Sequence, residues 1–257
     1  MTFSESRDRH ENGMIVYPRD VSLRRELLFI EESFQHPAKM NLHLLNDIIE
    51  HTSKPGDTVM DITAGSGSLL MACAMGRKVV CIDLNPTFIE WMHRSAEAMS
   101  IPDNLRIILH GDCRDFLPLP AQSIIFSPPY SDVLKGSGGI MSREIVGEQM
   151  GRYQEDPRNL GNLTEFMFNR AMDAIYKKCW DSLPPGGTLT LIIKDTLKGG
   201  KLNPLGWNHV QMMYKAGWEL QEWHIWDPPG TQFKAIHRAK GHRTVEGEHI
   251  IIMRRPV

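Results

Sequence analysis

Residues 58–74 join an apolar run, a glycine-containing turn and an apolar helical pattern without a break, and this order limits the folds open to the chain. The run 58–62 is typical of a buried strand, and the pattern from Leu69 predicts a helix that begins directly after the turn. In the turn, Gly65 and Gly67 allow the backbone to approach a ligand closely. The N–H groups at the start of the helix favour an anionic part of that ligand. The stretch therefore predicts a ligand-binding turn between a strand and a helix.

The same alternation of strand and helix continues along the chain. Apolar or alternating runs predict six further strands, at 78–83, 105–109, 123–126, 188–194, 219–226 and 249–253. Apolar residues at helical spacing predict helices at 23–34, 42–49, 69–74, 86–99, 163–183 and 204–216. This order is typical of an α/β fold with a mostly parallel sheet and helices on both faces. The last two runs predict an antiparallel C-terminal strand pair, so the expected sheet has seven strands.

Length and composition predict one domain spanning 1–257, with 1–35 as an N-terminal extension. The 29 Lys+Arg against 31 Asp+Glu give no overall positive field for non-specific binding to DNA. The balance is uneven, because residues 194–257 hold 10 Lys+Arg against 6 Asp+Glu. The four cysteines lack C-x-x-C spacing, and no apolar run resembles a signal peptide or a membrane span. We therefore expect a cytoplasmic protein.

An acidic residue ends the second predicted strand. Asp83 follows Asp61 by 22 residues, near the spacing at which nucleotide-binding folds place a carboxylate on ribose hydroxyls. The structural alternative is that Asp83 caps the helix that begins at Pro86. The matched glycine turn favours ribose binding, and the residues alone leave both readings open.

The fourth predicted strand stops at Ser127-Pro128-Pro129-Tyr130. The two prolines fix their own φ angles and lack N–H groups, so the turn is stiff. It lies at the carboxyl end of a strand, where ligands bind in α/β sheets. The Ser127 hydroxyl and the Pro128 carbonyl are expected to point the same way, with the Tyr130 ring beside them. Two acceptors and a stacking face suit a planar molecule with an exocyclic amino group, although a four-residue motif also occurs by chance.

Two polar stretches are expected to meet the substrate. Residues 131–161, rich in Gly, Ser and charge, predict a substrate or recognition loop, and residues 228–248 predict a basic hairpin loop. Phosphate contacts are expected from their basic residues, with simple solvation as the alternative: Arg143, Arg152, Arg158, Lys234, Arg238 and Arg243. Histidines in and beside the second loop lack the spacing of metal ligands, so no metal is expected.

Taken together, these motifs resemble those of the amino-methylating DNA methyltransferases, which make N4-methylcytosine or N6-methyladenine. They occur in the order His36-Pro37-Ala38-Lys39, Asp61 to Gly67, Asp83, Asp112 and Ser127-Pro128-Pro129-Tyr130. The resemblance covers 36–130 closely and 163–254 in outline, and it implies a Rossmann-like methyltransferase fold. The chain departs from the family at Ile62-Thr63, where Pro-Phe is usual, and at Met40-Asn41. These departures bear on how the cofactor is packed.

The resemblance implies S-adenosyl-L-methionine as the cofactor. The glycine turn would approach its amino-acid end, Asp83 would hold its ribose, and Asp112 would meet its adenine edge. The residues that the resemblance places at the cofactor are Pro37, Ala38, Lys39, Asp61, Thr63, Ala64, Gly65, Ser66, Gly67, Asp83, Leu84, Asp112 and Cys113.

The resemblance also implies direct methyl transfer to a base. The Ser127 hydroxyl and the Pro128 carbonyl would each accept a hydrogen bond from one N–H group of an aromatic amino group. These two hydrogen bonds would free the nitrogen lone pair for attack on the methyl group. Tyr130 would stack on a base that is flipped out of a DNA duplex or already single-stranded. Ser in the first motif position is commonest in cytosine-N4 enzymes, so we expect cytosine in DNA as the target. We also expect the enzyme to be a monomer or a homodimer and to belong to a restriction-modification system. Adenine N6 and an RNA base are the alternatives.

Three other classes of protein match the residues less well. Protein-glutamine methyltransferases use a similar turn but usually begin it with Asn. A nicotinamide dehydrogenase would need a third glycine in register after Gly67. A silent nucleic-acid-binding module would have no need for the glycine turn, Asp83 and the Ser127 turn together.

Overall fold

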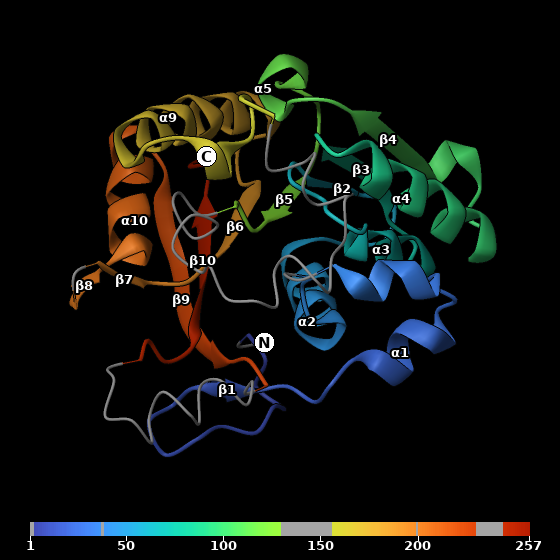
Figure 1. The fold of residues 1–257 in the computed structure, drawn as a ribbon, viewed down its shortest axis with the longest axis horizontal. Helices are drawn as coiled ribbons and strands as arrows, with labels where there is room; N and C mark the ends of the chain where they lie inside the picture. Colours follow the sequence, from blue (N-terminus) through green and yellow to red (C-terminus); the bar gives the residue numbers. More distant parts are fainter. Residues whose placement is uncertain (1–2, 37–38, 130–155, 199, 230–243) are drawn as a thin grey trace.

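The computed structural model describes residues 3–36, 39–129, 156–198, 200–229 and 244–257 (Figure 1). Within these residues an eight-stranded sheet has the order β1-β9-β10-β6-β5-β2-β3-β4. Its strands are β1 (Ile15–Val16), β2 (Thr58–Asp61), β3 (Lys78–Asp83), β4 (Arg106–His110), β5 (Ser123–Phe126), β6 (Thr188–Ile193), β9 (Glu219–Asp227) and β10 (Glu248–Arg254).

One strand runs against the others. β10 is antiparallel to both of its neighbours, with His249 opposite Ile193 of β6 and Ile225 of β9. The remaining pairs in this sheet are parallel. The predicted mostly parallel sheet with an antiparallel C-terminal pair is therefore confirmed, and each of the seven predicted strands ends within one residue of its observed bounds.

The expected strand count of seven is too low. β1 pairs in parallel with the outer side of β9, and at two residues it is too short to leave a period in the sequence. A separate hairpin of β7 (Thr196–Lys198) and β8 (Lys201–Asn203) was also not predicted.

The α-helices of the described residues are α1 (Val21–Glu26), α2 (Leu42–Thr52), α3 (Met71–Ala74), α4 (Pro86–Ala98), α5 (Cys113–Phe116), α9 (Glu165–Ser182) and α10 (Leu205–Lys215). The single helix predicted at 23–34 is wrong, because α1 ends at Glu26 and a 3₁₀ turn, η1, begins at Glu31. The cause is Leu28, whose φ of +64° lies in the left-handed region and ends the helix. In the described part of the chain, no helix combines the length and apolar character needed to cross a bilayer.

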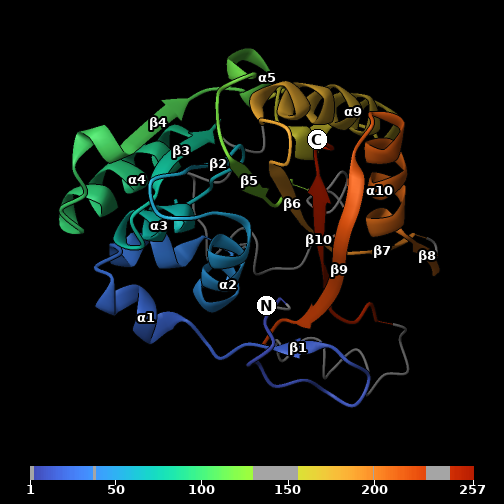
Figure 2. The ribbon, with the colours of Figure 1, turned by 180° about the vertical axis from the view of Figure 1, so that it is seen from behind.

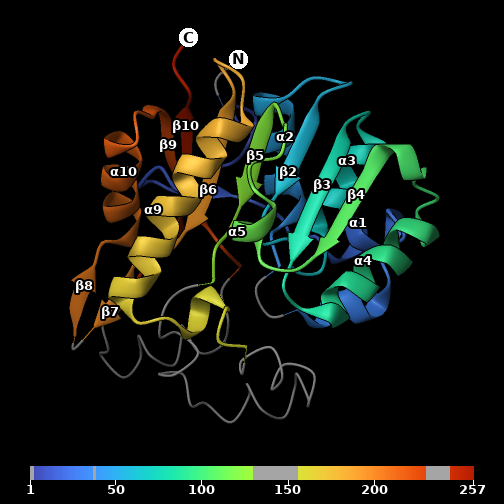
Figure 3. The ribbon, with the colours of Figure 1, turned by 90° about the horizontal axis from the view of Figure 1, so that it is seen from above.

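Helices cover both faces of the sheet (Figure 3). Successive residues of a strand point to opposite faces. Met60 and Ile124 accordingly pack with α5, α9 and α10, whereas Val59 and Ile125 pack with α2, α3 and α4. Burial on both faces explains why the central strands are apolar throughout rather than alternating.

The first part of the N-terminal extension, residues 3–17, packs on the body of the fold beside α2 and β9 (Figure 2). Phe3 is buried and its ring stacks on His224 of β9 at 5.0 Å. Ser4 donates to a carboxylate oxygen of Asp47 in α2 at 2.8 Å, and Arg7 pairs with the same carboxylate at 2.6 Å. Residues 3–17 are therefore joined to the fold by both apolar and charged contacts.

Candidate functional site

Strands β2 to β6 are parallel, so their carboxyl ends meet at one side of the sheet, which we call the carboxyl edge. A small pocket, partly open to solvent, lies at this edge. Its lining residues are Ile62, Thr63, Asp83, Leu84, Gly111, Asp112, Cys113, Pro129, Arg158, Asn159 and Leu160. Five of the predicted cofactor residues and one residue of the predicted catalytic turn therefore share one pocket.

The glycine turn is fixed by its neighbours on β3 and by the segment before α2. The Gly65 N–H donates to Asp83 Oδ2 at 2.7 Å, and the Ala64 N–H donates to the Ile82 carbonyl at 2.9 Å. The His36 ring covers Gly65 so closely that a Cβ on Gly65 would lie 2.8 Å from its Nε2. His36, the first residue of the predicted His36–Lys39 motif, therefore lies directly on the predicted cofactor turn.

Asp83 does not cap α4, so the structural alternative for this residue is wrong. Asn85 is the N-cap, and its Oδ1 accepts from the Thr87 N–H at 2.9 Å. Asp83 Oδ1 instead accepts from the Asn85 N–H at 2.8 Å. Burial raises the pKa of Asp83 to about 6, and the backbone N–H groups of Asn85 and Gly65 oppose that rise. The backbone of Leu84 is a third donor to Asp83, and a carboxylate accepts about four hydrogen bonds, so about one acceptor position remains.

Asp61, at the end of β2, is also a buried acid with a raised pKa. Burial raises its pKa to about 7; the N–H of Thr63, which donates to Oδ1 at 2.9 Å, opposes this rise, and the charge of Asp83 adds to it. The two buried carboxylates, of which Asp83 lines the pocket, give this part of the carboxyl edge a negative charge that increases as the pH rises through about 6 to 7.

We predict that Asp61→Asn stabilises the protein in a pH-dependent way. The folded pKa lies above the ordinary value of 3.8, so the folded state holds a proton that the unfolded chain releases, and stability falls as pH rises from about 4 to 7. A neutral amide removes this cost. The free energy of unfolding should increase by about 2 kcal/mol at pH 8, once the unpaired amide group has offset part of the gain, and should not increase at pH 4.

Urea unfolding at the two pH values measures this difference. Asp103→Asn is the control, because Asp103 is exposed and its replacement should change stability little at either pH. An equal change at pH 4 and pH 8 for Asp61→Asn would contradict the assignment of a raised pKa.

The predicted catalytic turn follows β5 and borders the pocket. Ser127 is half-buried, Pro128 is buried, and Pro129 lines the pocket. The Thr63 hydroxyl donates to the Ser127 carbonyl at 3.0 Å, so the turn after β2 is bonded to the turn after β5. Thr63 replaces a residue that is usually Phe in the resembled family, and its hydroxyl makes a contact that Phe lacks.

Several predicted site residues lie outside the described residues: Pro37, Ala38, Tyr130, Arg143, Arg152, Lys234, Arg238 and Arg243. Lys39 is described, and its ammonium group donates to the Phe34 and His36 carbonyls at 2.9 and 3.2 Å. Lys39 thus stabilises its own segment. Among the described residues, no group of three or more His, Cys, Asp or Glu side chains is arranged to hold a metal ion.

Two side chains near the glycine turn fit the predicted cofactor. Ser66 Oγ and Asn85 Nδ2 are buried and have no hydrogen-bond partner among the described residues. Buried polar groups are nearly always paired, so these two atoms are available to a group that binds beside the glycine turn. Together with the glycine turn and the acid after β3, they match the hydroxyls and charged groups of a nucleoside cofactor.

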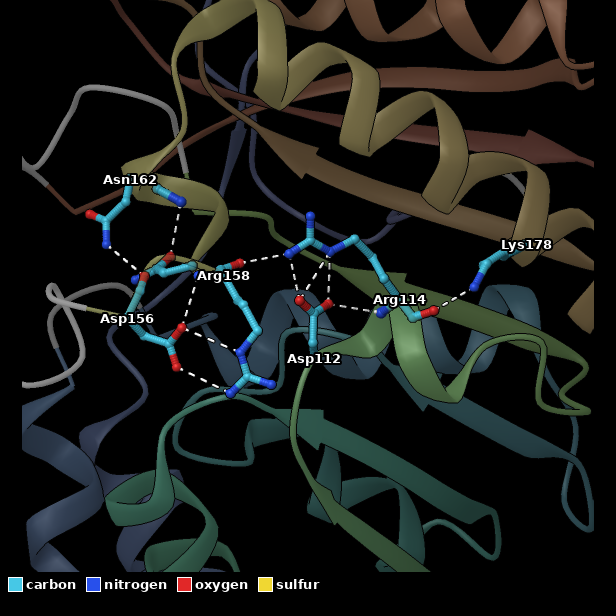
Figure 4. A network of polar contacts seen from close by, with 8 residues as sticks. Asp112, Arg114, Asp156, Arg158, Asn162 and Lys178 are labelled. Atoms are coloured by element: carbon cyan, nitrogen blue, oxygen red, sulfur yellow. Dashed lines mark hydrogen bonds and ion pairs between the residues drawn. The ribbon is translucent and has the colours of Figure 1, made fainter.

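Four residues of this site were given no role in the sequence analysis: Gly111, Arg114, Asn159 and Leu160. Arg158, Asn159 and Leu160 form one pocket wall, and Arg114 holds Asp112 (Figure 4). Arg158 was predicted only as a phosphate contact. The Asp112-x-Arg114 spacing was visible in the sequence, but nothing in it indicates that the guanidinium group turns back onto the acid.

Residues 5–94 match the family model N6_N4_Mtase, described as a DNA methylase. The match includes the glycine turn and Asp83 and ends before Asp112 and the Ser127 turn. It confirms the resemblance to the amino-methylating DNA methyltransferases and supports S-adenosyl-L-methionine as the cofactor of this fold.

Other similar proteins include a tRNA methyltransferase. A tRNA (guanine(37)-N(1))-methyltransferase of Leishmania major is 34% identical over 84 residues, which is 30% of this chain and 12% of that protein. The crystal structure of TrmN from Thermus thermophilus has a TM-score of 0.52 and 15% identity over 87% of this chain and 52% of that one. A methyltransferase from Pyrococcus furiosus has a TM-score of 0.51 and 14% identity over 92% and 100%. The chain thus spans 12% of the Leishmania major protein and about half of TrmN, and the structural likeness confirms the Rossmann-like methyltransferase fold.

Proposed function

We propose that this protein transfers a methyl group from S-adenosyl-L-methionine to the exocyclic amino group of a base in DNA, with cytosine N4 as the target. The observation that carries the proposal is the placement of the Ser127-Pro128-Pro129 turn. Pro129 lines the same pocket as Asp83 and Leu84, and Thr63 bonds the turn to the glycine-turn segment at 3.0 Å. The cofactor that donates the methyl group and the base that accepts it would therefore bind next to each other at this pocket.

The chain's own groups prepare the amino group for attack. The cofactor supplies an electrophilic methyl group when bound. The Ser127 hydroxyl and the Pro128 carbonyl accept hydrogen bonds from the two N–H groups of the target amino group. These hydrogen bonds shift the nitrogen towards a tetrahedral shape and make its lone pair available. Two prolines and the bond from Thr63 restrain the turn before the base arrives, so less order has to be imposed during the reaction.

A second candidate substrate is a base in RNA. It is favoured by the Leishmania major relative named as a tRNA (guanine(37)-N(1))-methyltransferase, which is 34% identical over 84 residues. That protein's name describes transfer to N1 of guanine, a ring nitrogen, whereas the Ser127 turn suits an exocyclic amino group. The near balance of 29 Lys+Arg and 31 Asp+Glu is compatible with either nucleic acid.

Methyl-labelled S-adenosylmethionine, supplied with duplex DNA, single-stranded DNA and tRNA in separate reactions, tests the proposal. The nucleic acid is digested and the labelled nucleoside identified. We expect N4-methylcytosine in DNA. Label in N6-methyladenine would keep the chemistry and replace the base. Label in RNA alone would favour the second candidate, and cofactor binding without transfer to any substrate would refute the catalytic proposal.

A further inference from the structure

Two tryptophan rings are stacked at the surface, on the side of the sheet against which Leu160 of the pocket wall packs. Trp207, in the first turn of α10, lies on Trp223 of β9, with the ring centroids 6.2 Å apart and the ring planes inclined by 15°. Figure 1 shows α10 alongside β9. This contact covers one face of Trp207, yet 51% of the residue is exposed. Tryptophan is usually more deeply buried, so the second face of Trp207 is open to a further ring.

Trp223 is held by a chain of hydrogen bonds that leads to the carboxyl edge. Its Nε1 donates to His249 Nδ1 at 3.1 Å, which requires Nδ1 to be unprotonated and places the ring proton on Nε2. That Nε2 lies 3.2 Å from Asp195 Oδ1, which also accepts from the Gly206 N–H at 3.0 Å. Gly206 directly precedes Trp207, and an added Cβ there would lie 2.7 Å from the His249 ring. Both tryptophans are therefore ordered before a ligand arrives, which lowers the entropic cost of binding.

The stacked pair lies close to the proposed catalytic turn. The strand register places Trp223 opposite Ile251 of β10, and Ile251 opposite Leu191 of β6. Leu191 is in turn opposite Phe126, the residue before Ser127. Three strand spacings therefore separate Trp223 from the start of the turn, which is about 15 Å at about 4.8 Å per strand. A DNA strand covers this distance in roughly four nucleotides, at about 3.4 Å per step.

The segment that carries Trp207 has an excess of positive charge. Residues 194–218 contain four Lys and one Asp, in a chain whose overall formal charge is −2. The one acid is Asp195, which pairs with His249. Lys201 and Lys215 are exposed. An open aromatic ring on a cationic segment suits a nucleic acid strand, because lysines attract the phosphates while a base stacks on the ring.

We propose that the open face of Trp207 stacks on an unpaired base of the DNA substrate, a few nucleotides from the base that is methylated. Trp223 supports the ring from behind, and lysines of residues 194–218 contact the neighbouring phosphates. The inference rests on the proposed function for its choice of DNA, whereas the stacking itself needs neither cofactor nor methyl transfer. Every base has a face that can stack, so the platform holds the strand in place and does not select its sequence.

Fluorescence anisotropy of a labelled single-stranded DNA oligonucleotide of mixed sequence, measured without cofactor, tests this platform. Trp207→Ala should raise Kd by about tenfold or more, which is the usual effect of removing one stacking ring. Trp207→Phe should recover most of the affinity, whereas Trp207→Leu, which keeps apolar surface without an aromatic face, should not. The slope of log Kd against log salt concentration should be unchanged in Trp207→Ala, because no phosphate contact is lost.

Two controls separate stacking from a general loss of surface. Tyr214→Ala is the matched variant, because Tyr214 is an exposed aromatic residue in the last turn of the same helix, away from the carboxyl edge. It should leave Kd unchanged. An abasic oligonucleotide of the same length keeps the phosphates and lacks the bases, so the unmodified protein and Trp207→Ala should bind it equally.

Several outcomes would overturn the proposal. An unchanged Kd in Trp207→Ala, an equal loss in Tyr214→Ala, or full recovery in Trp207→Leu would show that Trp207 is no stacking platform. A loss of affinity confined to an RNA oligonucleotide of the same sequence would overturn the assignment to DNA. Failure of methyl transfer to any nucleic acid would refute the proposed function, whereas the ratio of Kd values would still decide the role of Trp207.

Discussion

Ser127→Ala is expected to lower kcat for methyl transfer by about 100-fold while leaving the affinity for S-adenosyl-L-methionine unchanged. The hydroxyl is proposed to accept a hydrogen bond from one N–H group of the target amino group. Loss of one aligned hydrogen-bonding group that acts in the transition state typically lowers kcat by about 100-fold or more. Ser127 touches the body of the site through its carbonyl, which accepts from Thr63 at 3.0 Å and stays in the variant. The effect should therefore appear in kcat rather than in folding.

Single-turnover methyl transfer measures the rate of the chemical step, and calorimetry measures the affinity for the cofactor, so the two effects are separated. Ser127→Thr retains a hydroxyl and should recover part of the rate. Ser6→Ala is the control, because Ser6 is exposed and the same substitution there should change neither the rate nor the cofactor affinity. A Ser127→Ala protein that binds cofactor normally and keeps its full rate would show that the turn has no catalytic part.

Gly67→Ala is expected to cost on the order of 3 kcal/mol in the free energy of unfolding and to weaken cofactor binding strongly. Gly67 has a φ of +80°, and an added Cβ would lie 2.5 Å from Cγ of Met92, a fully buried residue of α4. The left-handed conformation alone costs about 1–2 kcal/mol for a residue with a Cβ. Overpacking against a buried side chain adds about 1–3 kcal/mol.

A second glycine separates these two costs. Gly56 has a φ of +91°, but a Cβ there would meet nothing within 4 Å. Gly56→Ala should therefore show only the conformational cost and normal cofactor affinity. Adding Met92→Ala to Gly67→Ala should relieve the clash and recover part of the affinity. Equal losses in the two glycine variants, measured by urea unfolding, would show that the contact with Met92 contributes nothing.

Most of the sheet could be predicted from sequence because its central strands are buried on both faces. Apolar runs such as 123–126 and 188–193 have few alternatives in a chain of this length. Two local features escaped this reasoning. The conformation of Leu28 breaks a pattern that otherwise reads as one helix, and β1 depends on pairing with β9 rather than on its own two residues.

The pocket residues that follow the sheet strands were easier to predict than the pocket wall formed by residues 158–160. The resemblance places Thr63, Asp83, Leu84 and Cys113 at the cofactor, and they share one pocket because parallel strands end at or just before them on one edge of the sheet. Leu160 reaches the pocket from a segment far along the chain, and no local pattern indicates that contact. The role expected for Asp112 followed from its position, whereas its hydrogen bonds depend on a side-chain direction that the sequence does not encode locally.

The position of β10 has a consequence for how the chain reaches its final form during synthesis. β10 lies between β6 and β9, although both precede it in the sequence. Until residues 248–254 leave the ribosome, β6 presents an open edge and β9 has no partner on that side. Unpaired strand edges invite association with other chains. Nascent protein that already carries the whole pocket is therefore still exposed to aggregation, and insertion of a single strand removes both open edges at once.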